Sequence, residues 1–275
     1  MSIKLRSGLF TPATRSERFS RAAETGADLL FIDLEDSVAH ADKERARDKA
    51  ITALLMPRST HTAQALRINS VNTLMGLMDL TALVRSGAYP DVLLLPKTES
   101  AAEVSLVDAV LHQSKADTRL IPLVESAKGL RALDEIAGAT DRVIGLMLGA
   151  ADLSADLGCS PDASNLDVAR AGLVSACAIA GIAAMDSPYF DVRDAAGLIR
   201  DAEKARSMGF TGKAAIHPNQ VAAINAIFTP SPEAIARAHK VLEINEKGVG
   251  TLDGQMIDEA IARQARRIVA SADLM

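Results

Sequence analysis

The sequence contains no tryptophan, and only 3% of its 275 residues are aromatic. A chain of this length buries a large core, so alanine, leucine, isoleucine, valine and methionine must supply most of that core. Cysteine is also scarce, because Cys159 and Cys177 are the only two and their spacing matches no metal-binding motif. We expect both thiols to be reduced, as is usual in the cytoplasm.

Long apolar runs are missing as well. No stretch approaches the roughly 18 apolar residues that a membrane-spanning helix needs, and the first ten residues lack the apolar core of a secretory signal. The formal net charge is −5, and no basic, aromatic-rich stretch of the kind that binds nucleic acid is present. The composition therefore predicts a soluble, cytoplasmic protein that binds neither nucleic acid nor membranes.

The sequence does contain a regular alternation of short apolar runs and amphipathic stretches. Eight runs have the length and composition of buried strands, and helical patterns separate them at intervals of about 30 residues. Eight parallel strands close a barrel, so we predict the α/β class and a (β/α)8 TIM barrel, with a doubly wound open sheet as the alternative. The predicted strands are Gly8–Pro12, Leu29–Leu34, Ala65–Asn69, Val92–Pro96, Leu120–Glu125, Val143–Leu148, Ala183–Asp186 and Ala214–His217.

The chain continues well beyond the eighth strand. We predict a catalytic barrel over residues 1–228 and a C-terminal helical extension over residues 229–275, which contains helices at Glu233–Lys247 and up to about Ala270. A barrel does not need this extension to close. It is either a packed appendage or a lid or exchanged arm that brings Asp258 to an active site. The helices predicted within the barrel include Lys43–Leu55, Ala101–Leu111, Leu166–Ala180 and Val192–Ser207.

Polar residues follow nearly every predicted strand. In α/β barrels the catalytic residues gather at the carboxyl ends of the strands, so this distribution indicates an enzyme. The residues at these ends are Pro12 with Arg15, Asp33 to Asp36, Arg67 with Asn69, Lys97 with Glu99, Glu125, Asp152, Asp186 and His217.

Glu125 and Asp152 form the most informative pair among these residues. Each follows an apolar run, and the two runs belong to consecutive predicted strands. Two carboxylates from neighbouring strands suit Mg²⁺, which typically takes one or two protein carboxylates and leaves its other positions to water and substrate. The alternative is that both are solvated loop acids.

Arg67 lies within an otherwise apolar strand and therefore needs a partner. Its planar guanidinium fits a carboxylate or thioester oxygen of a ligand, but a structural ion pair with Glu35 or Asp36 is an alternative. The three acids Asp33, Glu35 and Asp36 repel one another unless cations or hydrogen-bond donors offset their charges. They are candidates to hold the waters of a metal ion, to anchor Arg67 or to cap the following helix.

Other basic residues suggest several kinds of chemistry. Arg15, Arg18 and Arg21 recur every three residues, and on one side of a helix start they would bind phosphates, although surface arginines often have this spacing. Lys97 is a candidate Schiff-base lysine, which a metal site makes less plausible because the two are alternative electron sinks. His217 is a candidate general base or a structural residue.

An ordered set of short motifs resembles the HpcH/HpaI aldolase and citrate lyase β-subunit superfamily, in its CitE-like acyl-CoA lyase branch. The resemblance covers essentially the whole chain, and the ordered set is far more specific than any single motif. The motifs are RSGLFTPA at 6–13, DLEDSV at 33–38, K-x-x-A-R at 43–47, LRIN at 66–69, LPK-x-E at 95–99, VES at 124–126, GAADLSADLG at 149–158, GKAAIHPNQ at 212–220 and GQMID at 254–258.

This resemblance implies roles for individual residues. It makes Glu125 and Asp152 the Mg²⁺ ligands, Arg67 the substrate-binding arginine, and Asp258 a catalytic acid that the C-terminal segment often brings to a neighbouring subunit. It also implies oligomers, usually trimers or hexamers. Glu35 and Asp36 are alternative catalytic carboxylates that would act through water if the C-terminal segment is not a lid.

The resemblance also implies a binding site for coenzyme A. The region from Phe10 to Arg21, which includes Arg15 and Arg18, and the stretch before His217 correspond to CoA contacts, and Lys97 is a further candidate for binding the substrate. Many relatives have Pro-Gly after the first strand, whereas this chain has Pro12 and Ala13, which makes the fit of CoA there less certain.

The expected reaction is the Mg²⁺-dependent cleavage of a 3-hydroxyacyl-CoA, such as citramalyl-, malyl- or citryl-CoA, to acetyl-CoA and a 2-oxo acid. One alternative is a citrate lyase β subunit that acts on a citryl thioester of an acyl carrier protein partner. Another is a metal-dependent aldolase for free 2-oxo acids, which the Asp258 motif disfavours. A scaffold without activity would bind no Mg²⁺.

Overall fold

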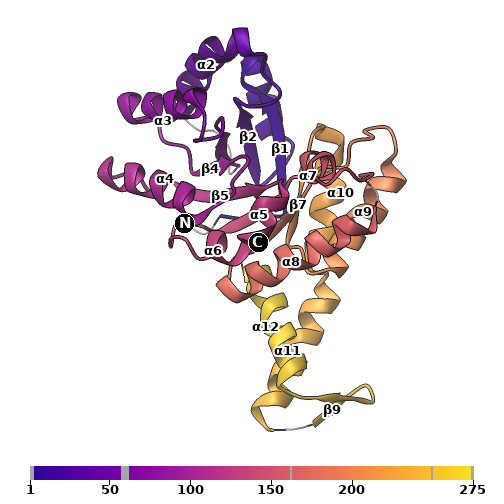
Figure 1. The fold of residues 1–275 in the computed structure, drawn as a ribbon. Coiled ribbons are helices and arrows are strands. Elements are labelled where there is room, and N and C mark those ends of the chain that lie inside the picture. The colour runs from indigo at the N-terminus through magenta and orange to yellow at the C-terminus, as the bar shows by residue number, and fades with distance from the viewer. Residues whose placement is uncertain (1–2, 57–61, 162, 249, 274–275) are drawn as a thin grey trace. The chain divides into compact units, whose positions relative to one another are not determined.

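The computed structural model describes residues 3–56, 62–161, 163–248 and 250–273. Eight parallel strands pair in sequence order, and the first also pairs with the eighth, which closes the sheet into a barrel (Figure 1). The predicted (β/α)8 barrel is therefore confirmed, and the open sheet is excluded. The strands are β1 (Ser7–Pro12), β2 (Leu29–Asp33), β3 (Ala63–Arg67), β4 (Val92–Leu95), β5 (Arg119–Val124), β6 (Gly145–Leu148), β7 (Ala183–Asp186) and β8 (Gly212–Ala215).

Helices alternate with these strands and follow the predicted order. The predicted helix at Val192–Ser207 begins instead at Ala195, because the Asp194 carboxylate accepts the Gly197 N–H at 2.8 Å and caps the helix there. The helices of the barrel are η1 (Ala13–Arg18), α1 (Phe19–Ala23), η2 (His40–Asp42), α2 (Lys43–Leu55), α3 (Leu74–Ser86), α4 (Ala101–Gln113), α5 (Ala127–Arg131), α6 (Leu133–Ala137), α7 (Ala150–Leu157), α8 (Ser164–Ala180), α9 (Ala195–Ser207) and α10 (Pro218–Phe228).

The barrel strands are apolar runs because they are buried on both faces. All four residues of β4 and all four of β6 are buried, one face toward the barrel interior and the other toward the helices. The largest fully buried side chains include Phe31 and are otherwise mostly leucines and isoleucines, as the composition predicts. The predicted end of the last strand at His217 is two residues too late, because the Ile216 and His217 N–H groups donate to the Gln220 side chain.

A buried cluster of charges corrects the expectation for Asp186. Although Asp186 ends β7, its carboxylate lies 2.6 Å from Lys213 Nζ and 3.1 Å from Arg170 Nε. Lys213 is fully buried on β8 and also pairs with Asp201 of α9 at 2.5 Å. These ion pairs hold the pKa of Asp186 below its usual range against the opposing effect of burial. Asp186 therefore joins β7, β8 and the surrounding helices rather than facing a ligand.

The described chain divides into two compact units, Leu5–Asn225 and the residues from 226 onward together with residues 3–4. In the second unit, α11 (Pro232–Glu246) and α12 (Glu259–Asp273) pack side by side (Figure 1), and a hairpin of β9 (Gly250–Leu252) and β10 (Gln255–Ile257) joins them. Asp253 and Gly254 have φ of 51° and 79° at the tip, as a tight hairpin turn requires. The buried core of this unit is Ala238, Val241, Ile257 and Ala265.

No helix in the part of the chain that the structure describes combines the length and apolar character needed to cross a membrane.

Candidate active site

The carboxyl ends of β2 and β3 bring Arg67 and Asp33 together. The two residues are partners in the strand register, and Asp33 accepts Nε at 2.6 Å and Nη2 at 2.7 Å. Asp33 also accepts the backbone N–H groups of Glu35 and Ser37 at 2.9 and 3.3 Å. These donors hold the pKa of Asp33 below its usual range even though burial alone would raise it. The Asp33 carboxylate is therefore ionised, and its hydrogen bonds hold Arg67 and the backbone at Glu35 and Ser37.

Arg67 makes further contacts with Glu35 and Phe10. Nη1 lies 3.1 Å from Glu35 Oε2, and the guanidinium carbon lies 4.8 Å from the centre of the Phe10 ring. Phe10 in turn stacks on Phe31 at 4.7 Å. The alternative of a structural ion pair thus holds for Glu35 and not for Asp36, while Asp33 is the main partner. Arg67 offers a ligand only the N–H bonds that these acids leave unused.

Lys97 connects Glu35 with Asp36. Its ammonium forms an ion pair with Glu35 Oε1 and lies 3.3 Å from Asp36 Oδ1. These two acids raise the pKa of Lys97 above its usual value, although burial opposes the shift. A Schiff-base lysine needs a lowered pKa so that a neutral amine is present, so the structure contradicts this role for Lys97. Burial raises the pKa of Glu35, while Arg67 and Lys97 act in the opposite direction.

Glu125 follows β5 and points into the group of acids. Its Oε1 accepts the Lys97 backbone N–H at 2.7 Å, and its side chain is almost completely buried. Burial, together with the charges of Glu35 and Asp152, raises the pKa of Glu125 to about 8. Gly149 leaves room for the other oxygen, since a Cβ there would lie 2.5 Å from Glu125 Oε2.

Asp152 lies in the first turn of α7, three residues beyond Gly149, and is exposed. Because β5 and β6 are neighbours in the barrel, Asp152 comes near enough to Glu125 for their charges to interact. The described residues contain no group of three or more histidine, cysteine and acidic side chains arranged to hold a metal ion. Two carboxylates nevertheless fit Mg²⁺, whose remaining positions go to water and substrate.

A buried oxygen next to this pair supports the fit. Glu35 Oε2 is inaccessible to solvent and makes no hydrogen bond to any described residue, although Arg67 Nη1 pairs with it at 3.1 Å. The crowding of Glu35, Glu125 and Asp152 is costly while all three are ionised, and a divalent cation offsets that cost. The donor set and the space beside Gly149 therefore suit a hard cation held by Glu125 and Asp152.

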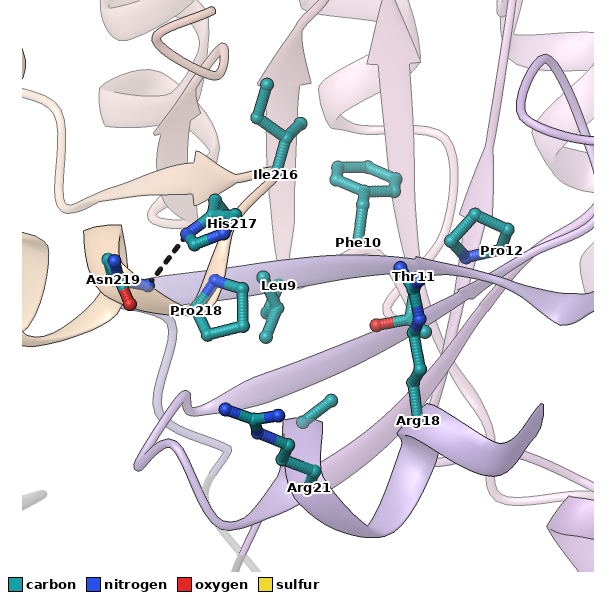
Figure 2. A pocket seen from close by; sticks show the side chains of 11 residues that line it. Leu9, Phe10, Thr11, Pro12, Arg18, Arg21, Ile216, His217, Pro218 and Asn219 are labelled. Atoms are coloured by element: carbon teal, nitrogen blue, oxygen red, sulfur yellow. Dashed lines mark hydrogen bonds between the residues drawn. The ribbon is translucent and has the colours of Figure 1, made fainter. Parts of the chain in front are cut away.

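A pocket of about 330 Å³ opens beside β1 (Figure 2). Arg18 and Arg21 reach it from η1 and α1, and His217 reaches it from the loop after β8. The Nδ1 of His217 accepts the Asn219 N–H at 3.2 Å, drawn as a dashed line in Figure 2, which leaves Nε2 to face other groups. Phe10 belongs both to this pocket and to the packing around Arg67, so the pocket adjoins the acids.

The three arginines after the first strand do not share one helix side, which corrects the expectation. The chain there is a 3₁₀ turn that is non-helical at Arg15, followed by the separate helix α1. Arg18 and Arg21 line the pocket, whereas Arg15 is exposed, lies outside it and pairs weakly with Glu17 at 3.8 Å.

The sequence did not predict the hydrogen-bond network that supports the acidic loop, which contains Asp33, Glu35 and Asp36. Lys43 Nζ donates to the carbonyl oxygens of Leu34 and Glu35 and to Asn69 Oδ1, each at 2.7 Å. Asn69, a candidate at a strand end, is buried and donates to Asp79, which also pairs with Arg47 at 2.7 Å. The K-x-x-A-R spacing was the available signal, because it places both basic residues on one face of α2.

Asp258 lies in the second unit, where it caps α12. Its Oδ1 accepts the Ile261 N–H at 3.0 Å, and its side chain is exposed. The cap explains why an acid is favoured at this position, and the exposure leaves its other oxygen open to a ligand.

Comparison with known proteins gives consistent matches. The family model described as HpcH/HpaI aldolase/citrate lyase matches residues 6–218. The chain is 34% identical to citrate lyase subunit beta of Escherichia coli (strain K12), over 98% of this chain and 93% of that protein. It is also 34% identical to an L-malyl-CoA/beta-methylmalyl-CoA lyase of Rhodobacter capsulatus, over 97% and 94% of the two chains.

A solved structure resembles the whole chain. It is the CitE protein of Mycobacterium tuberculosis in complex with magnesium, acetoacetate and coenzyme A, with a TM-score of 0.81 and 33% identity over 99% of each chain.

Proposed function

Because the chain belongs to the HpcH/HpaI aldolase/citrate lyase family, it is a carbon–carbon lyase, and we propose that it cleaves a 3-hydroxyacyl-CoA with Mg²⁺. The substrate has a carboxylate on the carbon that bears the hydroxyl, as in citramalyl-, malyl- or citryl-CoA, and the products are acetyl-CoA and a 2-oxo acid. The observation that supports this most is the pair of Glu125 and Asp152 beside Glu35 and Arg67, next to a pocket that contains two arginines.

Glu125 and Asp152 would hold the Mg²⁺, which supplies a Lewis acid for the hydroxyl and carboxylate of the part that leaves as the 2-oxo acid. The bond between C2 and C3 breaks as the hydroxyl gives up its proton to a carboxylate. Glu35 is positioned for this step by Arg67 and Lys97. Asp36, the more exposed neighbour, is the second candidate.

The electron pair of the broken bond passes to the thioester and gives the enolate of acetyl-CoA. Arg67 offsets this negative charge or that of the substrate carboxylate with the N–H bonds that Asp33 and Glu35 leave unused. A proton then returns to the methyl carbon, and Asp258 is the proposed donor. The hydroxyl proton lost and the methyl proton gained balance, so no other reactant is needed.

The pocket beside β1 is the proposed CoA site. Arg18 and Arg21 would contact phosphates, and the apolar Leu9 and Phe10 would contact the uncharged part of the ligand. Arg15 lies outside this pocket, so we propose no role for Arg15 in binding CoA to the pocket of its own chain. The CitE complex with coenzyme A supports a CoA ligand for this fold.

The second candidate is a citrate lyase β subunit that acts on a citryl thioester of an acyl carrier protein. The likeness to the Escherichia coli subunit favours it. A panel of purified acyl-CoA thioesters with Mg²⁺, read out as acetyl-CoA release, distinguishes the two. Rapid, saturable release from one free CoA thioester supports our proposal, whereas release only from the carrier-protein thioester supports the second candidate. Cleavage of free 2-oxo acids without CoA would indicate an aldolase instead.

We further propose a cytoplasmic homotrimer or hexamer. Helix α3 exposes Leu74, Leu77 and Met78 on one side, an apolar surface of the kind that subunit contacts cover. Light scattering coupled to gel filtration measures the subunit number.

A further inference from the structure

Lys97 has a backbone conformation that lysine rarely adopts. It lies two residues beyond β4 with a φ of +53°, in the left-handed region that favours glycine. Such residues cluster at functional sites, where the surrounding structure holds them in place. Two other non-glycine residues in the described chain, Lys115 and Asp253, share this feature.

The two ends of Lys97 contact different acids of the site. Its backbone N–H donates to Glu125 Oε1 at 2.7 Å. Its ammonium pairs with Glu35 Oε1 and, at 3.3 Å, with Asp36. A single residue therefore fixes one oxygen of a proposed metal ligand and, at the same time, the carboxylate proposed to take the hydroxyl proton.

Glu35 is close enough to compete for the cation. Its negative charge acts on Glu125 more strongly than the charge of Asp152 does. Its Oε2 is buried and makes no hydrogen bond to any described residue, although Arg67 Nη1 pairs with it at 3.1 Å. In the structure, the described residues contain no set of three acids arranged around one metal position.

We propose that Lys97 is a positioning residue that keeps Glu35 off the metal ion and available as the proton acceptor. The ammonium pairs with Glu35 and Asp36, which leaves Glu125 and Asp152 to bind the cation. This inference rests on the proposed function. Loss of the ammonium would let Glu35 become a third carboxylate ligand, and its proton-accepting oxygen would no longer be free.

The relative affinities for Ca²⁺ and Mg²⁺ report this change without any measurement of turnover. Ca²⁺ takes six to eight oxygen ligands and gains from added carboxylates, whereas Mg²⁺ keeps several waters and uses one or two. Lys97→Met should therefore strengthen Ca²⁺ binding at least about tenfold and Mg²⁺ binding by about threefold at most. The same variant should lower kcat about 100-fold with little change in KM, because a general base contributes on that scale.

The experiment compares four variants of the full chain by calorimetric titration with MgCl₂ and with CaCl₂, and by acetyl-CoA release. Lys97→Met removes the charge, Lys97→Gly also relieves the left-handed backbone, and Lys97→Arg keeps the charge. Lys115→Gly is the matched control, because it relieves a lysine with a φ of 55° that lies before the amino end of β5, whereas the acids follow the carboxyl ends of the strands. We expect Lys115→Gly to match the unmodified protein in metal affinities and in acetyl-CoA release. We expect Lys97→Arg to match it in the preference between Ca²⁺ and Mg²⁺.

Weaker binding of both ions together with lower kcat in Lys97→Met and Lys97→Gly would overturn the proposal, because it would mean that Lys97 only maintains the fold. Unchanged kcat would overturn it as well. If Lys97→Met fails to fold, Lys97→Arg still decides, since a loss of metal preference with the charge retained contradicts the proposal. The titrations need no substrate, so they test Lys97 even if none of the proposed thioesters is cleaved.

Discussion

The Arg67 guanidinium and the Asp33 carboxylate form two parallel contacts, with Nε 2.6 Å from Oδ1 and Nη2 2.7 Å from Oδ2. Both groups are largely buried, and their strand positions are direct neighbours. Arg67, which the sequence motifs assigned to substrate binding, is therefore held mainly by an ion pair within the protein. Its orientation toward a ligand depends on Asp33.

Asp33→Asn should lower the free energy of unfolding by about 3 kcal/mol, because the buried guanidinium of Arg67 loses its main charged partner and keeps only Glu35 at 3.1 Å. Urea denaturation at neutral pH measures the loss. The matched control is Asp42→Asn, which breaks the exposed ion pair between Asp42 and Arg45 at 2.8 Å. The control should cost less than about 1 kcal/mol. Equal effects of the two variants would contradict the importance of the buried pair.

Glu125→Gln should stabilise the metal-free protein while it abolishes turnover. The folded pKa of Glu125 is about 8, above its usual value, so its contribution to stability is present at low pH and is lost as the pH rises toward 8. Glutamine stays neutral throughout. We expect a gain on the order of 2–4 kcal/mol at pH 8.5 and about 1 kcal/mol at pH 5.

Thermal unfolding across this pH range, in the presence of a chelator, measures the gain. Glu135→Gln, at an exposed position on α6, is the control and should show no such pH dependence. A destabilised Glu125→Gln protein at pH 8.5, or turnover close to that of the unmodified protein under saturating Mg²⁺, would contradict the assignment. Asp152→Asn should likewise lose turnover while remaining folded.

Gly149→Ala should weaken Mg²⁺ binding at least about tenfold, as changes around metal ligands commonly do. The added Cβ would lie 2.5 Å from both Cβ and Oε2 of Glu125, so that carboxylate has to move. Calorimetric titration measures the affinity. Gly172→Ala is the control, since its nearest neighbour, Leu133 Cδ1, is at an ordinary 3.5 Å and alanine favours the helix. An unchanged affinity in Gly149→Ala would show that Oε2 does not bind the ion.

Asp258→Asn should lower turnover about 100-fold without loss of stability. Asparagine caps a helix as well as aspartate does, so the α12 cap seen at Ile261 is kept while the charge is removed. Asp258→Ala should lose both turnover and some stability. Full turnover of Asp258→Asn would exclude Asp258 as the proton donor.

Mixing Asp258→Asn with Glu125→Gln protein then tests whether the site is shared. Recovery of activity on mixing means that one subunit supplies Asp258 to the site of another. No recovery, with both variants assembled, means that each chain completes its own site.

Much of the fold could be predicted because it depends on local patterns. The eight strands were found from apolar runs buried on both faces, and their ends are within two residues of the observed ones. The proximity of Glu125 and Asp152 could be predicted as well, because the two residues follow neighbouring predicted strands. Asp186 was interpreted incorrectly, because nothing local indicates that Lys213 and Arg170 will surround it.

The sequence by itself determined the barrel, its aliphatic core, the family and the set of acids and bases at the strand ends, because periodicity and motif order are properties of the chain. Only the tertiary structure decided how those charges pair: Arg67 with Asp33, Lys97 with Glu35, and Glu125 with the Lys97 backbone. The energy of an ion pair depends on distance and burial, and both are set by residues far apart in the sequence.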